Sequence, residues 1–324
     1  MLKRCLAFLV LLSLGFFSSP LFAERLKVGY VSRDLNYLPF FIAQKKGFYA
    51  REGIEVDLIA IGRADLQAQA LVSAELHFAL INPDGVIVLE EKGTHLKVVA
   101  GSSNSAPYLL IGGKNYKKID ELKGARLGVA SLKGGATSIL LSYLKTKGMT
   151  YPHDFGLVVI AGGTPARLSA LESGSVAGAV LGIPFADIAI DKGFNRLGDT
   201  TEAISKYQFN AVNVNPVWAE KNRASVVKFL KAHIQSIRWI YERPAEAADF
   251  LVKEFGLKQP YAQKGIDYYT ANRVYPVDGS VTLEGLKVNV EVQAQDGLVK
   301  EPAPPPEKYV DLSYLKQAQK ELGL

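Results

Sequence analysis

Residues 26–61 read LKVGYVSRDLNYLPFFIAQKKGFYAREGIEVDLIAI, and this stretch decides the fold. Two short apolar runs typical of strands flank a longer segment with a helical pattern, and a polar loop follows the first run. Pro39 suits the first turn of the helix, where its missing N–H has no partner to lose. The stretch therefore predicts a strand, a loop, a helix and a strand, at 26–31, 32–36, 39–52 and 56–61.

The same alternation continues through the next forty residues. The pattern predicts a helix, a strand, a second helix and a second strand, at 65–73, 78–81, 86–92 and 96–101. Alternating strands and helices are typical of a mostly parallel sheet that is covered by helices on both faces. The first hundred residues are therefore expected to form an α/β lobe.

A second unit of the same kind follows. Its expected strands and helices alternate at 126–130, 137–147, 157–160, 165–172 and 178–181. At an offset of one hundred residues, the segment 70–74 (ALVSA) aligns with 170–174 (ALESG), and 78–81 (FALI) aligns with 178–181 (GAVL). Residues 27–29 (KVG) similarly resemble 126–128 (RLG). The sequence thus predicts two structurally similar lobes with mostly parallel sheets.

The pattern changes after Tyr207. An extended segment is expected at 209–214, and amphipathic helices are expected to cover the first lobe at 224–241, 245–255 and 283–295. A proline-rich stretch at 301–306 precedes a last helix that ends near Leu322. The expected organisation is lobe one at 24–105 plus 210–300, lobe two at 106–209, and a C-terminal segment at 301–324.

The N-terminus predicts export. Lys3 and Arg4 precede an apolar run and a short Leu-Phe-Ala segment that ends at Ala23, which is the pattern of a signal peptide at residues 1–23. The single cysteine, Cys5, is then removed, so the mature chain forms no disulfide. We expect a periplasmic monomer with a net charge of +4, because two of the six excess positive charges belong to the signal peptide. Nucleic acid is not expected as a partner, because the Lys and Arg residues form no long run.

Candidate ligand-binding residues follow the strands. Ligands of open parallel sheets bind beyond the carboxyl ends of the strands, where loops lead into helix N-termini that have free N–H groups. Six loops occupy such positions, at 32–37, 62–65, 82–84, 131–137, 162–165 and 182–185. From them we select as ligand-binding candidates Asp34, Asn36, Tyr37, Arg63, Asn82, Asp84, Lys133, Gly135, Thr137, Thr164 and Phe185.

Catalytic and metal-binding patterns are not found. The four histidines are far apart in the sequence and lack the spacing of metal ligands, so neither a metal nor a cofactor is predicted. The loop at 133–137 (KGGAT) lacks the Gly-Lys-Ser/Thr ending of a nucleotide P-loop, although its glycines suit an anionic group. Glu90 and Glu91 are expected on the solvated face of a helix. A binding function is therefore favoured over an enzymatic one.

Several segments resemble one known family. The residues 38–43 (LPFFIA), 46–49 (KGFY), 52–56 (EGIEV) and 119–129 (IDELKGARLGV) are similar to those of ABC-importer solute-binding proteins related to the sulfonate, nitrate and thiamine-pyrimidine binders. The resemblance implies a type 2 periplasmic binding fold, in which two strands near 102–110 and 207–214 join the lobes as a hinge. It also implies that the lobes close around a small-molecule solute and that ABC permease subunits in the membrane recognise the closed form.

The sequence departs from this family at one turn. Relatives usually have a glycine two or three residues before an aspartate at the end of the second helix, but this chain has Ala74-Glu75-Leu76-His77-Phe78, and the second copy has Gly174-Ser175-Val176-Ala177. The cysteine-rich motif of the pyrimidine synthases in the same family is also absent.

The ligand and the role of the protein stay open in part. Basic and acidic residues occur in similar number in the six loops, so an organic anion is favoured only slightly over a neutral or aromatic solute. The alternatives to transport are a pyrimidine synthase-like enzyme on the same fold and a sensor subunit that presents the solute to a membrane receptor.

Overall fold

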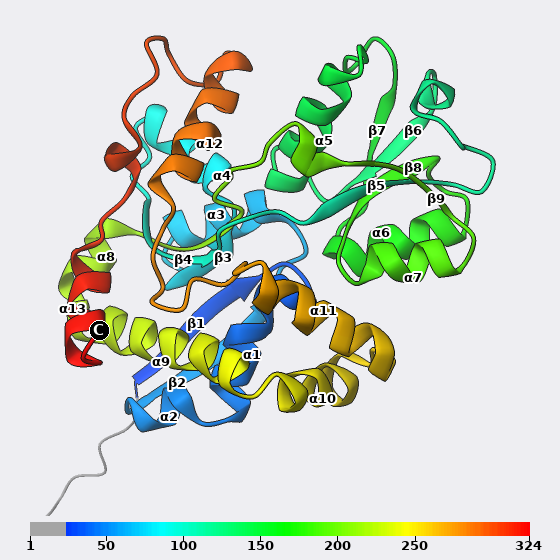
Figure 1. Ribbon diagram of the computed structural model, residues 1–324. Helices are drawn as coiled ribbons and strands as arrows, with labels where there is room; N and C mark the ends of the chain where they lie inside the picture. Colours follow the sequence, from blue (N-terminus) through cyan, green and yellow to red (C-terminus); the bar gives the residue numbers. More distant parts are fainter. Residues whose placement is uncertain (1–23) are drawn as a thin grey trace, which may run out of the picture.

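The computed structural model describes residues 24–324, and the predicted signal peptide at 1–23, including Cys5, lies outside these residues. Two lobes each contain one five-stranded sheet (Figure 1). The first sheet has the order β2-β1-β3-β10-β4, and the second has the order β7-β6-β8-β5-β9. The strands are β1 (Glu24–Tyr30), β2 (Ile54–Ala60), β3 (Phe78–Ile81), β4 (Lys97–Ser103), β5 (Tyr108–Gly112), β6 (Arg126–Val129), β7 (Gly156–Val159), β8 (Gly178–Gly182), β9 (Asn195–Asp199) and β10 (Asn210–Val214).

The two sheets are copies of one pattern, as the internal repeat predicts. In the first sheet β1 pairs with β3 in parallel, with Val28 opposite Phe78, and in the second β6 pairs with β8 with Leu127 opposite Gly178. The fourth strand of each sheet is antiparallel to both of its neighbours. The predicted α/β fold with two similar lobes is therefore confirmed.

Each antiparallel strand enters its sheet directly after the chain has crossed between the lobes. The first crossing runs from β4 of the first sheet to β5 of the second, and the other runs from β9 to β10. These are the two predicted hinge strands. Strand β9 has no counterpart in the prediction, because its sequence Asn-Arg-Leu-Gly-Asp lacks an apolar run.

Helices flank both sheets (Figure 1). The expected helix at 39–52 is divided in two, because Gly47 adopts a left-handed conformation with φ of 72°. The helices are α1 (Leu38–Lys45), α2 (Phe48–Arg51), α3 (Ala64–Val72), α4 (Pro83–Glu91), α5 (Gly135–Thr146), α6 (Gly163–Glu172), α7 (Phe185–Asp191), α8 (Pro216–Lys221), α9 (Arg223–Glu242), α10 (Pro244–Phe255), α11 (Gln259–Ala271), α12 (Leu283–Gln295) and α13 (Ser313–Glu321). Short 3-10 turns occur at η1 (Leu35–Tyr37), η2 (Ile119–Leu122), η3 (Thr200–Glu202) and η4 (Pro306–Tyr309).

The C-terminal helices return to the first lobe, as predicted for three of them. Helix α9 packs on α1 and α2, and α12 packs on α4. Helix α11, which the sequence analysis did not predict, also contacts the second lobe. Tyr261 OH donates to Asp191 Oδ2 at 2.7 Å, and Lys264 Nζ lies 2.5 Å from Asp187 Oδ1. The α10–α11 pair thus reaches below α7 (Figure 1).

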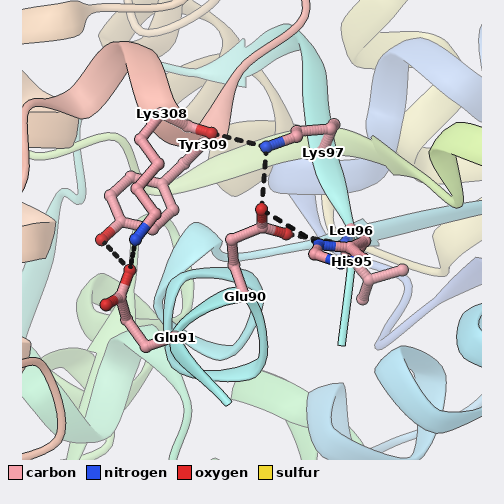
Figure 2. A network of polar contacts seen from close by, with 7 residues as sticks. All are labelled: Glu90, Glu91, His95, Leu96, Lys97, Lys308 and Tyr309. Carbon is pink, nitrogen blue, oxygen red and sulfur yellow. Dashed lines mark hydrogen bonds and ion pairs between the residues drawn. The ribbon is translucent and has the colours of Figure 1, made fainter. Parts of the chain in front are cut away.

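The C-terminal segment is fastened to the first lobe by a polar network, shown in Figure 2. Lys308 Nζ and Tyr309 OH both donate to Glu91 Oε1, at 2.5 Å and 2.7 Å. Lys97 Nζ donates to Glu90 Oε1 at 3.0 Å and to the Lys308 carbonyl at 2.6 Å. The bond from Lys308 lowers the pKa of Glu91. The expectation that both glutamates lie on a solvated face is therefore wrong, because their side chains are 8% and 15% exposed.

One buried glutamine ties the two crossings together. Gln208 Nε2 donates to the Ser103 carbonyl at 3.2 Å and to Asn104 Oδ1 at 3.0 Å, both on the first crossing. Its Oε1 accepts from the Thr282 N–H at 2.8 Å, and its backbone N–H donates to Asn289 Oδ1 at 3.1 Å. Gln208 is completely buried. The hinge is therefore one hydrogen-bonded joint rather than two independent strands.

No helix within residues 24–324 is both long and apolar enough to cross a membrane.

The turn after α3 generates a stability prediction. Ala74 has a φ of 59°, and the equivalent Gly174 has a φ of 71°. A left-handed conformation costs a residue with a Cβ about 1 kcal/mol, whereas glycine adopts it freely. We expect Ala74→Gly to raise the free energy of unfolding by up to about 1 kcal/mol and Gly174→Ala to lower it by a similar amount. Urea denaturation of both variants measures this, and changes of the same sign would contradict it.

A buried histidine generates a second prediction. His233 on α9 stacks on Phe40 with ring centroids 4.5 Å apart, and its Nε2 lies 3.0 Å from the Gly101 carbonyl. Burial lowers the pKa of His233 from 6.5 to about 4, and the bond to Gly101 opposes that shift only in part. The native histidine therefore stays neutral at pH values where the unfolded chain takes up a proton.

Between pH 6.5 and about 4, the free energy of unfolding should consequently fall by about 1.4 kcal/mol per pH unit through this residue. Glutamine can replace the Nε2 donor without titrating, so His233→Gln should remove this part of the acid sensitivity. Urea denaturation across this pH range measures the effect, with exposed His153→Gln as the matched control. An equal pH slope in the wild-type protein and in His233→Gln would show that His233 is not responsible.

Candidate ligand-binding site

A cavity of about 60 Å³ lies between the two lobes. Its walls come from the segments that follow β1, β2 and β3 in the first lobe, from the segments that follow β6 and β7 in the second, and from the two crossings. The lining residues are Val31, Ser32, Asp34, Asn36, Tyr37, Ala64, Ile81, Asn82, Tyr108, Ala130, Ser131, Gly134, Gly135, Ala136, Thr137, Gly163, Thr164, Arg167, Phe209 and Asn210.

Most of the predicted residues line this cavity. They are Asp34, Asn36, Tyr37, Asn82, Gly135, Thr137 and Thr164. Arg63, Asp84 and Lys133 line a neighbouring hollow of about 360 Å³ instead. Phe185 begins α7 and packs into the hydrophobic core, and it lines neither space. The structure thus brings five of the six predicted loops together at the cavity, but not the loop at 182–185, and it does not bring every selected side chain into one site.

Asp84, Arg63 and Lys133 lie in different surroundings outside the cavity. Asp84 is buried, and its carboxylate accepts from Ser138 Oγ and Tyr207 OH at 2.6 Å and from Asn289 Nδ2 at 2.8 Å. Arg63 forms an ion pair with Asp65, with Nη2 and Oδ2 2.5 Å apart. Lys133 is exposed on its loop. These contacts give Asp84 a structural role, whereas the ion pair of Arg63 is partly exposed to solvent.

Asp34 is the charged group on the wall of the first lobe. Its Oδ1 accepts from the Asn36 N–H at 3.0 Å and so caps η1, and its Oδ2 accepts from Ser32 Oγ at 2.5 Å. Burial raises the pKa of Asp34, whereas these hydrogen bonds and the positive charge of Arg167 oppose that shift. Asp34 therefore depends on nearby donors or cations to stay ionised.

Neutral side chains fix the shape of the same wall. Asn36 Oδ1 accepts from Tyr269 OH at 3.0 Å, and Asn36 Nδ2 lies 3.4 Å from Tyr108 OH. Asn82 caps α4, since its Oδ1 accepts from the Asp84 N–H at 2.8 Å, and its Nδ2 donates to the Phe209 carbonyl at 2.9 Å. The amide of Asn82 is thus committed to protein partners. It forms the wall rather than offering free donors.

Arg167 on α6 is the charged group on the opposite wall. It is 1% exposed, its Nε donates to the Val180 carbonyl at 2.9 Å, and its Nη2 donates to Thr164 Oγ1 at 3.2 Å. Burial lowers the pKa of Arg167, and Tyr108 and Asp34 oppose that shift. The guanidinium nevertheless stays charged, because its ordinary pKa is above about 12. Arg167 is not among the selected candidates, which all come from the six loops, whereas Arg167 lies inside α6.

Two buried polar atoms on the walls have no protein partner within residues 24–324. They are Ser131 Oγ and Asn210 Oδ1, and both residues are at most 2% exposed. Buried polar groups are nearly always hydrogen-bonded, since an unsatisfied one costs about 1–3 kcal/mol. Both residues line the cavity, so a bound molecule that reaches these atoms would satisfy them.

The lobes touch around the cavity. The Gly162 N–H donates to the Gly62 carbonyl at 3.1 Å, and Ser138 Oγ bonds Asp84 from the other lobe. Two glycines permit this approach. A Cβ at Gly135 would come within 3.0 Å of the Asn82 amide, and one at Gly163 would come equally close to Ser32 Oγ. The structure therefore represents a closed arrangement of the lobes.

Groups for catalysis are sparse at this site. None of the four histidines lines the cavity. Within residues 24–324, no three His, Cys, Asp or Glu side chains are grouped so that they could hold a metal ion. The chemistry that the cavity offers is recognition through hydrogen bonds and one charge on each wall.

Known proteins share this architecture. YtlA of Bacillus subtilis (strain 168), whose name marks it as a suspected binding protein, is 24% identical over 262 residues, 78% of each chain. The periplasmic nitrate-binding protein NrtA of Synechocystis PCC 6803 superposes with a TM-score of 0.75 at 16% identity, over 93% of this chain and 89% of NrtA. The periplasmic aliphatic sulphonate binding protein SsuA of Escherichia coli gives 0.67 at 17% identity, over 90% of this chain and 99% of SsuA.

Because these two structures share only 16% and 17% of their residues with this chain, they show its fold alone. A family model described as NMT1/THI5 like matches residues 34–247, which is more than half of the chain and includes every residue that lines the cavity except Val31 and Ser32. The predicted family is thereby confirmed: the chain belongs to the NMT1/THI5-like family and has the periplasmic binding protein fold.

Proposed function

We propose that this protein is a periplasmic solute-binding protein that captures a small organic solute with an anionic group and delivers it to an ABC importer. The lobes that close on the solute comprise residues 24–105 with 210–300 and residues 106–209. Export through a signal peptide at 1–23 and a monomeric state belong to the same proposal. It is supported by the family and by the sulphonate- and nitrate-binding proteins of the same fold.

The buried charge of Arg167 is the observation that carries the proposal. Removing a guanidinium from water is costly unless it is paired, and its hydrogen bonds to described residues go to two neutral oxygens, of Val180 and Thr164. Charge-assisted hydrogen bonds to an anionic ligand are roughly twice as strong as neutral ones. An anionic group in the cavity would therefore compensate for the burial of Arg167.

The N-termini of two helices in the second lobe also favour an anionic group in the cavity. Helices α5 and α6 begin at Gly135 and Gly163, which both line the cavity. The first N–H groups of a helix have no partner within the helix, and its N-terminus carries a partial positive charge. Two N-termini and one guanidinium thus surround the same space, where an anion is stabilised.

Closure explains how binding leads to delivery. A solute that contacts both walls favours the arrangement in which Gly62 meets Gly162 and Ser138 meets Asp84. A permease that recognises only this arrangement then distinguishes loaded from empty protein.

A solute screen tests the proposal. The purified protein is heated with sulfonates, carboxylates, nitrate, pyrimidines or amines, and a ligand at 100 times its dissociation constant should add about 2.7 kcal/mol of stability. Arg167→Met should weaken binding of the solute by about 2 kcal/mol or more, which is close to 30-fold. Arg63→Met is the matched control, because Arg63 lies outside the cavity. The proposal fails if no solute binds, or if both variants bind the solute as tightly as the wild-type protein.

Closure itself gives a further prediction. Gly135→Ala places a Cβ against Asn82 of the other lobe and should hold the lobes apart, so affinity should fall at least about tenfold while the thermal midpoint of the free protein stays unchanged. Gly85→Ala is the control, since a Cβ there has open space. Titration calorimetry measures the affinity, and small-angle X-ray scattering measures the radius of the loaded protein. Full compaction and unchanged affinity in Gly135→Ala would refute this role for the contact.

A further inference from the structure

The two walls of the cavity offer opposite hydrogen-bonding groups. On the wall of the first lobe, Asp34 and the unpartnered Asn210 Oδ1 are acceptors. On the wall of the second lobe, Arg167 and the N-termini of α5 and α6 are donors, and the unpartnered Ser131 Oγ can also donate. A molecule that satisfies both walls needs a donor at one end and an acceptor at the other.

The charged side chains are divided between the two walls in the same way. Among the residues that line the cavity, only Asp34 and Arg167 have charged side chains, and they lie on opposite walls. No N–O distance between them is within 4.0 Å, so they form no ion pair, although each affects the pKa of the other. The two charges cancel. A simple anion would satisfy Arg167 but would leave the buried Asp34 facing additional negative charge.

We propose that the solute is a small zwitterion, with its anionic group on the side of Arg167 and a protonated amine between Asp34 and Asn210 Oδ1. This inference rests on the proposed function and specifies the class of solute. The amine supplies the cation that a buried carboxylate requires, and its N–H groups satisfy the unpartnered amide oxygen. The rings of Tyr37 and Tyr108 line the cavity beside Asp34 and can pack on the spacer between the two groups.

The volume limits the length of the spacer. A cavity of about 60 Å³ has room for roughly four to six water molecules. A small solute with a short spacer between its two charged groups is therefore expected. Amino acids and amino sulfonates with one to three carbons between the amine and the acid are solutes of this kind.

The role of Asp34 as a helix cap does not explain why a charged side chain is buried at the cavity. A capping oxygen needs no charge, since asparagine caps as well as aspartate. The cap also leaves Asn210 Oδ1 without a partner on the same wall. Asp34→Asn therefore separates the two roles, because it keeps the cap on η1 and removes the charge, while Ser32 Oγ can rotate to accept from the new amide nitrogen.

Matched probes test the inference by titration calorimetry of the full protein. β-Alanine is compared with propionate, and 2-aminoethanesulfonate with ethanesulfonate, so that each pair differs in the amine; ethylamine tests the amine alone, and glycine and 4-aminobutyrate vary the spacer. We expect at least one zwitterion to bind roughly tenfold or more tightly than its amine-free partner. In Asp34→Asn this preference should disappear, while the amine-free anion binds as well as before or better.

The outcomes distinguish the inference from the proposed function. If the amine-free anions bind the wild-type protein as tightly as the zwitterions, or if Asp34→Asn keeps the preference, the solute is not recognised as a zwitterion. The same conclusion follows if no zwitterion binds the protein while another class of solute in the screen does. The function as a binding protein then still stands. If no solute of any class binds, the proposed function itself fails. The comparison in the wild-type protein decides the inference even if Asp34→Asn does not fold.

Discussion

The arrangement of the two lobes depends on the hydrogen bonds of one buried side chain, Gln208. Its amide is bonded to Ser103 and Asn104 on the first crossing, to Asn210 on the second, and to the segment that leads into α12, so these bonds couple the two connections. Leaving any of these groups unsatisfied in a fully buried position would cost about 1–3 kcal/mol each. Rotation of the lobes must therefore occur around this joint, with the backbone on either side taking up the change.

The cavity is a consequence of the same joint. Each crossing delivers an antiparallel strand to the other sheet, and Tyr108 and Asn210 stand at the starts of these strands, where they line the cavity. Asn82 is fixed by the carbonyl of Phe209, the residue next to Gln208. The hinge thus forms the floor of the binding site as well as the axis between the lobes, so that a change in one affects the other.

The sequence predicts the lobes well because their elements repeat. Strand and helix periodicities are local properties, and the offset of one hundred residues places β3 and β8, and α3 and α6, in equivalent positions. The loops after the strands could also be predicted, since they must meet at one edge of each sheet. It could not be predicted which side chain of a loop faces the cavity, because that depends on the backbone angles of the loop and on the position of the second lobe. Asp84 and Phe185 follow strands as expected, yet tertiary packing turns one toward Tyr207 and Asn289 and the other into the core.

Arg167 shows most clearly what the sequence alone could not predict. Residues inside a helix are usually assigned to a core or a solvent face, and a lone arginine in an amphipathic segment suggests solvent. Its burial requires the Val180 carbonyl on β8 and the Thr164 hydroxyl one turn earlier, and only the packed lobe brings these together. The signal that the sequence offers is the composition of α6, GTPARLSALE, in which this arginine lies among small and apolar residues near the N-terminus.

The division of charge between the lobes couples selectivity to closure. Asp34 belongs to the first lobe and Arg167 to the second, so an open protein presents each charge separately and water can satisfy both. Closure removes that water, and the closed state is then stable only if the solute replaces it on both walls. A solute that satisfies one wall binds to one lobe without stabilising the closed state. Proteins of the same fold are named as sulphonate- or nitrate-binding, so the fold does not determine the ligand, and we propose that the pair of groups that meet on closure does.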